Sequence, residues 1–225
     1  VGLLWSFLHR PNFYQVGDGR MLGILYPFLP WTGIMLMGYC LGKWYEPAAS
    51  PGVRRKRLVM LGFGLIAFFI ILRASNIYGD PIAWTKGKNA LSTFFSFMNV
   101  QKYPPSLLFS SITIGIGLLL LALFERARGA FANVLNIYGR VPFFYYILHF
   151  FIIHLVCMGL FYAEGYGPES IRSPNSLFLF RPVEFGYPLW VVYLMWVALV
   201  ALLYPLCRWY NRYKSTHHHW WLSYV

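Results

Sequence analysis

The feature that most constrains the fold is a set of four long stretches without a single charged side chain. They are Met21–Gly42, Tyr103–Phe124, Val141–Ala163 and Phe185–Cys207. A helix needs about 20 apolar residues to cross a bilayer, and each of these stretches reaches that length. The strands of a membrane barrel would instead alternate apolar and polar residues in segments of about ten. The sequence therefore predicts an all-α, polytopic membrane protein.

A fifth and shorter apolar stretch, Leu58–Leu72, lies between Arg57 and Arg73. Arginines at both ends can extend their cations to the lipid headgroups, so this stretch is also expected to span. Val1–Leu8 is typical of the end of a further helix, because a proline soon follows and disfavours helix before it. We expect residues 1–225 to form a single membrane domain, itself a fragment of a larger one. It would hold five full transmembrane helices and an N-terminal helix stub.

The first span begins unusually, with Pro27 and Pro30 at its start. In lipid a proline leaves backbone carbonyls unpaired, so such a helix packs against protein or lines a water-filled site. Tyr26 and Trp31 at this end are candidate substrate-binding residues, as is Lys102 just before the span that follows the long outer loop. The alternative is that the two aromatic residues belong to the interfacial belt and that Lys102 is part of a rigid helix start.

The loops are expected to carry some structure of their own. Residues 73–105 are too long for a simple turn, and several aromatic side chains there suit a segment that lies at headgroup depth. These aromatic residues are Trp84, Phe94, Phe95 and Phe97. Ser106 is a candidate N-cap for the next helix. On the other side of the membrane, residues 129–138 are typical of a short surface helix.

The distribution of Lys and Arg sets the orientation. The larger share of the 19 basic residues falls on the side with loops 43–57 and 125–140 and the tail after Cys207. The run Arg54–Arg57, directly beside a span, is the strongest local signal. We expect this side, with the C-terminus, to be cytoplasmic. The net charge of +12 is spread over several loops, which favours anionic membrane lipids as partners and argues against nucleic acid.

Two histidines, His149 and His154, lie deep within the stretch Val141–Ala163. Ionisable groups inside a membrane are functional candidates, although a neutral histidine can also hydrogen-bond helices together. Their spacing places them about 140° apart around the helix, so no metal site is expected there. Tyr145 lies four residues before His149 and shares its face. The sequence makes His149 and Tyr145 the catalytic candidates and gives His154 a packing role.

Five sequence segments occur in order along the chain: LWSFLHRP, YPFLPWTGIMLMGYCLG, KYPPSLLF, GRVPFFYYILHFFIIHL and WWLSYV. Together they resemble bacterial membrane proteins related to heparan-α-glucosaminide N-acetyltransferase, in the transmembrane acyltransferase group. The resemblance covers essentially the whole chain and the C-terminal portion of the family. It implies an inner-membrane enzyme that moves an acetyl group from cytosolic acetyl-CoA to a sugar acceptor on the opposite face.

The resemblance also implies a preceding segment, with a D-x-x-R-G-like start and a histidine placed for acyl transfer, which these residues do not contain. We therefore expect the fragment to be inactive by itself. In acyl transfer a histidine acts as general base on the acceptor or briefly carries the acyl group. The phosphates of acetyl-CoA need cations on the cytosolic side, where Arg126, Arg128 and Arg140 stand together with the Arg54–Arg57 run.

Two other classes of protein stay open on the sequence. A transporter or flippase of a small polar or lipid-linked substrate would use the same kinked first span and histidines, although the spans show no internal repeat. A non-catalytic structural membrane protein is the second alternative. The residues leave open whether the chain forms a homo-oligomer.

Overall fold

The structure is a computed structural model that describes residues 2–17, 20–172 and 179–223. The last two residues of the WWLSYV motif lie outside this described part. The described chain is mostly helical, with one short hairpin, which confirms the helical fold class. It forms two compact units, Val1–Ala127 and Arg128–Val225.

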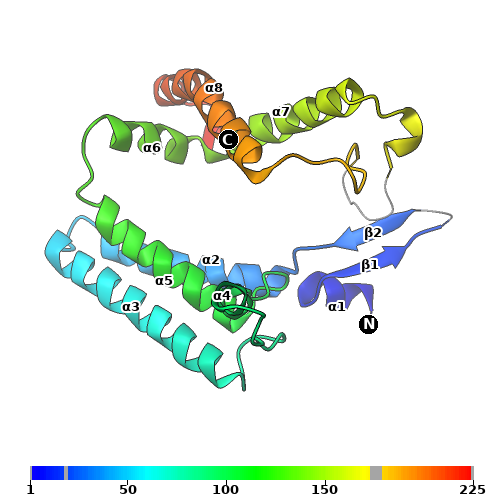
Figure 1. Ribbon diagram of the computed structural model, residues 1–225. Helices are drawn as coiled ribbons and strands as arrows, with labels where there is room; N and C mark the ends of the chain where they lie inside the picture. The colour runs from blue at the N-terminus through cyan, green and yellow to red at the C-terminus, as the bar shows by residue number, and fades with distance from the viewer. Residues whose placement is uncertain (1, 18–19, 173–178, 224–225) are drawn as a thin grey trace. The chain divides into compact units, whose positions relative to one another are not determined.

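The first unit contains a β-hairpin and a set of helices that are labelled in Figure 1. Its elements are α1 (Leu3–Leu8), β1 (Asn12–Gln15), β2 (Met21–Ile24), α2 (Phe28–Gly42), the 3-10 helix η1 (Lys43–Tyr45), α3 (Pro51–Ser75), α4 (Ala90–Met98) and α5 (Leu107–Phe124). The second unit is built from two long helices and shorter segments. Its elements are α6 (Ala130–Arg140), α7 (Pro142–Ala163), the 3-10 helix η2 (Pro168–Ser170), α8 (Leu189–Thr216) and the 3-10 helix η3 (Trp220–Ser223).

Four helices of the described chain, α3, α5, α7 and α8, are long and apolar enough to cross a membrane. They correspond to the expected spans 58–72, 103–124, 141–163 and 185–207, with shifted ends. Helices α3 and α8 continue into charged sequence, because helical hydrogen bonding does not stop where the apolar run stops. Helix α5 starts later than expected, at Leu107. Ser106 caps it as predicted, since the Phe109 N–H donates to the Ser106 Oγ at 3.0 Å.

The expected first span, Met21–Gly42, is wrong as one continuous helix. Residues Met21–Ile24 instead form β2, which pairs antiparallel with β1. Helix α2 begins only at Phe28, after Pro27 in an extended conformation. A proline favours extended backbone in the residue before it and cannot donate a hydrogen bond within a helix, so the helix cannot continue backward. With 15 residues, α2 is about 22 Å long, short of a hydrocarbon core of about 30 Å.

Glycines allow α3 and α5, which lie side by side in Figure 1, to approach closely. A Cβ atom on Gly115 would lie 3.1 Å from the Gly62 carbonyl oxygen and 3.0 Å from Cγ1 of Ile66. Close contact between small residues is how membrane helices commonly associate. The start of α3 packs on the end of α5, and the end of α3 packs on the start of α5, so the two helices run antiparallel. The buried side chains at the two ends are Leu58, Leu118 and Ala122, then Phe69, Leu108 and Ile112.

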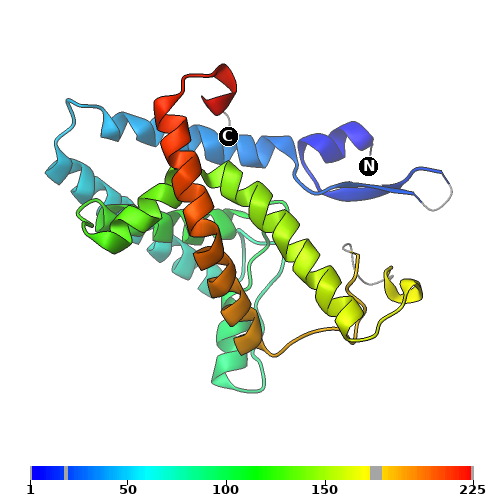
Figure 2. The same ribbon diagram turned by 90° about the horizontal axis from the view of Figure 1, so that it is seen from above.

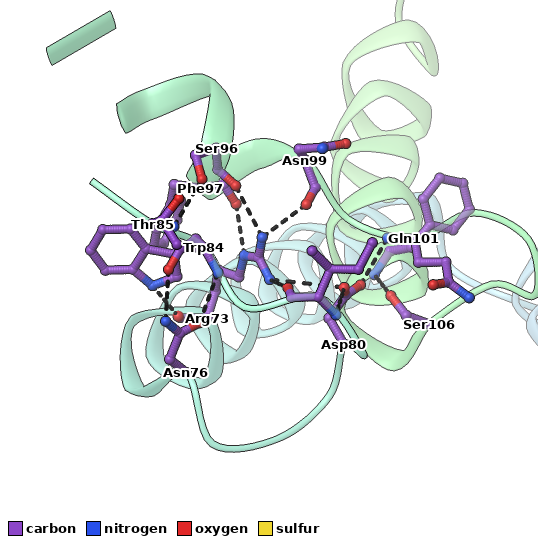
Figure 3. A network of polar contacts seen from close by, with 12 residues as sticks. Arg73, Asn76, Asp80, Trp84, Thr85, Ser96, Phe97, Asn99, Gln101 and Ser106 are labelled. Carbon is purple, nitrogen blue, oxygen red and sulfur yellow. Dashed lines mark hydrogen bonds and ion pairs between the residues drawn. The ribbon is translucent and has the colours of Figure 1, made fainter. Parts of the chain in front are cut away.

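Arg73, near the end of α3, is buried, so the expectation that it extends to the lipid headgroups is wrong. Its side chain is only 2% exposed. Figure 3 shows that it donates to four backbone carbonyls. The bonds run from Nε to Phe97 (2.9 Å), from Nη1 to Ile82 (2.7 Å), and from Nη2 to Ser96 (3.0 Å) and Asn99 (2.8 Å). Carbonyls at a helix end lack helical partners. The end of α4 and the preceding loop therefore supply acceptors that hold this cation within the protein.

The aromatic side chains of loop 73–105 divide between two environments. The ring of Phe97 packs against Trp84, with centroids 5.6 Å apart, and against Phe69 of α3 at 5.8 Å. Phe94 and Phe95 of α4 are instead more than half exposed. The loop is thus a folded cap that presents one aromatic face outward, as a segment at headgroup depth would.

In the second unit, α6 is the surface helix expected at residues 129–138, ending two residues later than predicted. Helices α7 and α8 meet near the start of α7, where the Phe144 and Tyr210 rings stack with centroids 4.2 Å apart. Val141 and Cys207 are fully buried at the same contact. Figure 2 shows the two helices separating toward the end of α7.

Candidate functional site

The three candidate substrate residues lie close together, at the start of α2 and just before α5. The ring of Tyr26 is 5.9 Å from that of Trp31, measured between centroids. Tyr103 completes the group: its ring centroid is 5.3 Å from Tyr26 and 6.4 Å from Trp31, and the two tyrosine hydroxyls are 3.1 Å apart. The Lys102 Nζ lies 5.1 Å from the Tyr103 ring centroid. We call Tyr26, Trp31, Lys102 and Tyr103 the aromatic cluster.

The aromatic cluster also contains polar groups with which a ligand can form hydrogen bonds. Within the described chain the buried Trp31 Nε1–H has no hydrogen-bond acceptor. The hydrogen bond from Tyr26 lowers the pKa of Tyr103, and Lys102 lowers it further. Aromatic faces with a few placed donors are typical of small-molecule sites. Sequence reasoning missed Tyr103, although its position next to Lys102 in the KYPP segment was a usable signal.

The two catalytic candidates stack on each other in α7. The rings of Tyr145 and His149 are 5.0 Å apart between centroids and nearly parallel, at 6°. The His149 Nδ1 lies 3.1 Å from the Tyr145 carbonyl oxygen one turn earlier. When Nδ1 carries the proton for that bond, Nε2 holds the lone pair that can accept a proton.

Tyr138 of α6 supports this pair, and sequence reasoning did not single it out. Its ring meets Tyr145 edge to face, with centroids 5.2 Å apart. Its hydroxyl donates to the carbonyl of Val200 in α8. Burial raises the pKa of Tyr138 to about 12, so the hydroxyl keeps its proton at neutral pH. Tyr138 therefore joins α6 and α8 around the face that carries Tyr145.

The three arginines proposed for acetyl-CoA are exposed and belong to two different units. Arg126 follows α5 and belongs to the first unit. Arg128 and Arg140 lie in the second unit at opposite ends of α6, a helix of 11 residues and about 16 Å. The described geometry does not bring Arg128 and Arg140 together around one phosphate group.

His154 lines a cavity of about 650 Å³ between α7, α8 and residues 179–187. Its Nδ1 lies 2.8 Å from the Phe150 carbonyl oxygen, in the same one-turn arrangement as His149. Most of the lining is apolar, and Arg181 is its only cation among the described residues. Nearby, the Tyr187 hydroxyl donates to Glu164 at 2.5 Å, and this bond raises the pKa of Tyr187.

Comparison with known proteins gives no match. No protein-family model, no curated protein and no solved structure matches this chain. The resemblance to the acetyltransferase group therefore depends on its five sequence segments, and function has to be inferred from the residues themselves.

Proposed function

We propose that this chain is part of a membrane-embedded acyltransferase related to heparan-α-glucosaminide N-acetyltransferase. It would move an acetyl group from cytosolic acetyl-CoA to a sugar acceptor at the opposite face of a bacterial inner membrane. The observation that carries the proposal is the aromatic cluster with its unpaired Trp31 indole N–H. A buried donor without a partner costs about 1–3 kcal/mol. A hydroxyl that accepts from Trp31 recovers that energy, while the rings cover the C–H face of the sugar.

The proposed chemistry uses His149 and Tyr145. The acceptor oxygen or nitrogen attacks the thioester carbon, and Nε2 of His149 takes its proton. When the carbon–sulfur bond breaks, the leaving thiolate receives that proton. Alternatively, Nε2 carries the acetyl group between donor and acceptor. Tyr145, stacked on His149, offers a hydroxyl to the oxyanion that forms in either route.

We further propose that α2 is a fifth crossing, which places loops 43–57 and 125–140 and the C-terminus in the cytoplasm. The support is its composition: α2 has no charged side chain and no buried residue. A short span is accommodated by local thinning of the bilayer and by flanking side chains such as Lys43. Single cysteines at Arg10 and Lys56, in a background without native cysteines, should react with an impermeant maleimide from opposite faces. If both cysteines react from the same face, α2 does not cross the membrane.

The decisive experiment uses the complete protein with labelled acetyl-CoA and a glucosamine acceptor. Trp31→Phe keeps an aromatic ring and loses the donor, so kcat/KM for the acceptor should fall about tenfold to a hundredfold. Trp209→Phe, at an exposed position of α8, is the matched control and should change little. Equal activity of Trp31→Phe and the parent protein would exclude the aromatic cluster from acceptor binding.

The role of His149 is tested in the same assay. Glutamine keeps hydrogen-bonding atoms but cannot accept a proton near neutral pH. The kcat of His149→Gln should therefore be about a hundredfold to ten-thousandfold lower than that of the parent protein. His154→Gln serves as the matched histidine control on the same helix and should retain turnover. A well-folded His149→Gln protein with near-normal acetyl transfer would make His149 structural.

One observation favours a second candidate function, a transporter or flippase of a lipid-linked substrate. The apolar cavity beside His154, with Arg181 in its lining, has the size and composition of a site for an amphipathic molecule. A flippase would move such a substrate in proteoliposomes without acetyl-CoA. The acyltransferase proposal requires acetyl-CoA for every turnover, so omitting it distinguishes the two functions.

A further inference from the structure

A second cavity, of about 180 Å³, lies at the turn that joins α2 to α3. Three cationic side chains line it: Lys43, Arg54 and Arg57. Trp44 and Ser50 contribute an aromatic ring and a hydroxyl. Among the described residues no acidic side chain lines this cavity. Its charge is therefore unlike that of the aromatic cluster and of the cavity beside His154.

The three cations differ in how their charge is balanced. Arg54 donates from Nε and Nη2 to the Oε1 of Glu125, and its Nη1 lies 3.4 Å from the Trp44 carbonyl oxygen. Arg57 lies over the Trp44 ring, 5.9 Å from its centroid, so its donors stay available. The Lys43 ammonium has no acceptor among the described residues. Glu125 thus neutralises Arg54 and holds its side chain in place. Among the described residues, no acidic side chain balances the positive charges of Lys43 and Arg57.

Backbone donors add to these charges. Helix α3 has 25 residues, and the side chain of its N-cap residue, Ser50, accepts no backbone hydrogen bond. The first intrahelical bond runs from the Arg54 N–H to the Ser50 carbonyl at 3.0 Å. The N–H groups of Gly52 and Val53 therefore remain for another acceptor. The start of a long helix also carries positive partial charge, which favours an anion.

We propose that this cavity binds a phosphate group, held by Lys43, Arg57, the Ser50 hydroxyl and the first N–H groups of α3. Water occupies about 30 Å³ per molecule, so 180 Å³ holds a phosphate and a few waters. Charge-assisted bonds from ammonium and guanidinium groups are the strongest that a phosphate receives. Two sources present this chemistry: the headgroup of an anionic lipid and a free phosphate compound such as coenzyme A. The coenzyme source rests on the proposed acetyltransferase function, and the lipid source does not.

The test measures binding to the complete protein in an uncharged detergent, by titration calorimetry. The two probes are coenzyme A and dioctanoyl phosphatidic acid, each titrated separately. Lys43→Gln and Arg57→Gln should each raise the Kd of the probe that binds by about tenfold or more. Lys56→Gln removes the same charge from the neighbouring exposed position, which does not line the cavity. It should weaken binding by less than about threefold, as a screened surface charge.

Each outcome decides between the two sources or rejects the site. Phosphatidic acid alone, bound in a manner sensitive to Arg57, supports a lipid site and leaves the donor of the acetyl group elsewhere. Coenzyme A alone, with the same sensitivity, supports a donor site. Coenzyme A that binds equally well to the parent protein and to both variants keeps the proposed function and overturns this inference. Equal losses in Lys56→Gln and Arg57→Gln, or no binding of either probe, also overturn it.

Discussion

Replacing Arg73 with methionine tests whether one buried cation holds the outer loop together. Methionine is similarly flexible but has no donor, so the carbonyls of Ile82, Ser96, Phe97 and Asn99 would lose their partner. Each bond from a charged donor is worth about 1.5–3 kcal/mol. These values do not add, since carbonyls near the surface recover water when the loop relaxes. Breaking a buried charged contact costs about 3–5 kcal/mol, which is the loss in unfolding free energy that we expect.

Two further variants separate charge from geometry. Arg73→Lys keeps the positive charge but cannot reach four carbonyls at once, so it should lose about half of that free energy. Asp80→Asn keeps the arginine bonds and removes the carboxylate charge 3.9 Å from Nη1. Asp80 also accepts from the Ile82 and Gln101 N–H groups through its two oxygens, and an amide offers only one. We expect the unfolding free energy of Asp80→Asn to lie between those of the parent protein and Arg73→Met.

The assay is thermal unfolding of the complete protein in detergent, combined with limited trypsin digestion. A loss of 3–5 kcal/mol lowers Tm by about 10 °C for a domain of this size. Lys86 and Lys88 lie exposed in loop 73–105, so cleavage there should accelerate in Arg73→Met before global unfolding begins. Arg126→Met, at an exposed arginine, is the control. A Tm within about 2 °C of the parent, with unchanged cleavage, would refute the reasoning that Arg73 organises the loop.

Two more predictions concern the first unit. Gly115→Ala places a Cβ 3.1 Å from the Gly62 carbonyl oxygen, which cannot move without separating α3 from α5, so we expect a loss of about 1–3 kcal/mol in thermal or denaturant unfolding. Gly117→Ala, whose Cβ would meet nothing within 4 Å, should be neutral or stabilising, and equal effects of the two variants would contradict the packing argument. For Tyr103, Tyr26→Phe removes the hydrogen bond that lowers its pKa, so its ultraviolet ionisation midpoint should move up toward the ordinary value of about 10. Because the folded protein releases this proton more readily than the unfolded chain, stability from this bond to the phenolate grows as pH rises through that range and is absent at neutral pH. An unchanged midpoint in Tyr26→Phe would contradict the assignment.

Local sequence rules predicted the elements whose cause is local. Four helices followed from apolar length, and the Ser106 cap followed from its own side chain and the next turn. The hairpin was missed because its second strand, Met21–Ile24, is a short apolar run that equally fits a helix start. The Val-Gly-Asp-Gly-Arg sequence just before it was the signal for a turn.

Long-range contacts account for what the sequence could not supply. A cation that ends an apolar run is normally drawn to the headgroups, and only the folded loop offers Arg73 the carbonyls of α4. The aromatic cluster likewise needs the start of α2 beside the start of α5. The sequence therefore named Tyr26, Trp31 and Lys102 singly, and the fold unites them with Tyr103.

The two sites proposed for the first unit lie at opposite ends of α5. Tyr103 precedes its first residue, and Glu125, which follows its last, holds Arg54 beside the phosphate cavity. With 18 residues the helix is about 27 Å long, close to the thickness of the hydrocarbon core. If the phosphate cavity holds acetyl-CoA and not a lipid headgroup, donor and acceptor bind at different faces, as the proposed transfer across the membrane requires. Variants at the two ends should therefore change different constants: Arg57→Gln should raise the KM for acetyl-CoA about tenfold and spare the acceptor, and Trp31→Phe should do the reverse. Initial rates measured against both substrates decide the matter, and a shared rise in both KM values would mean that the ends do not act as separate sites.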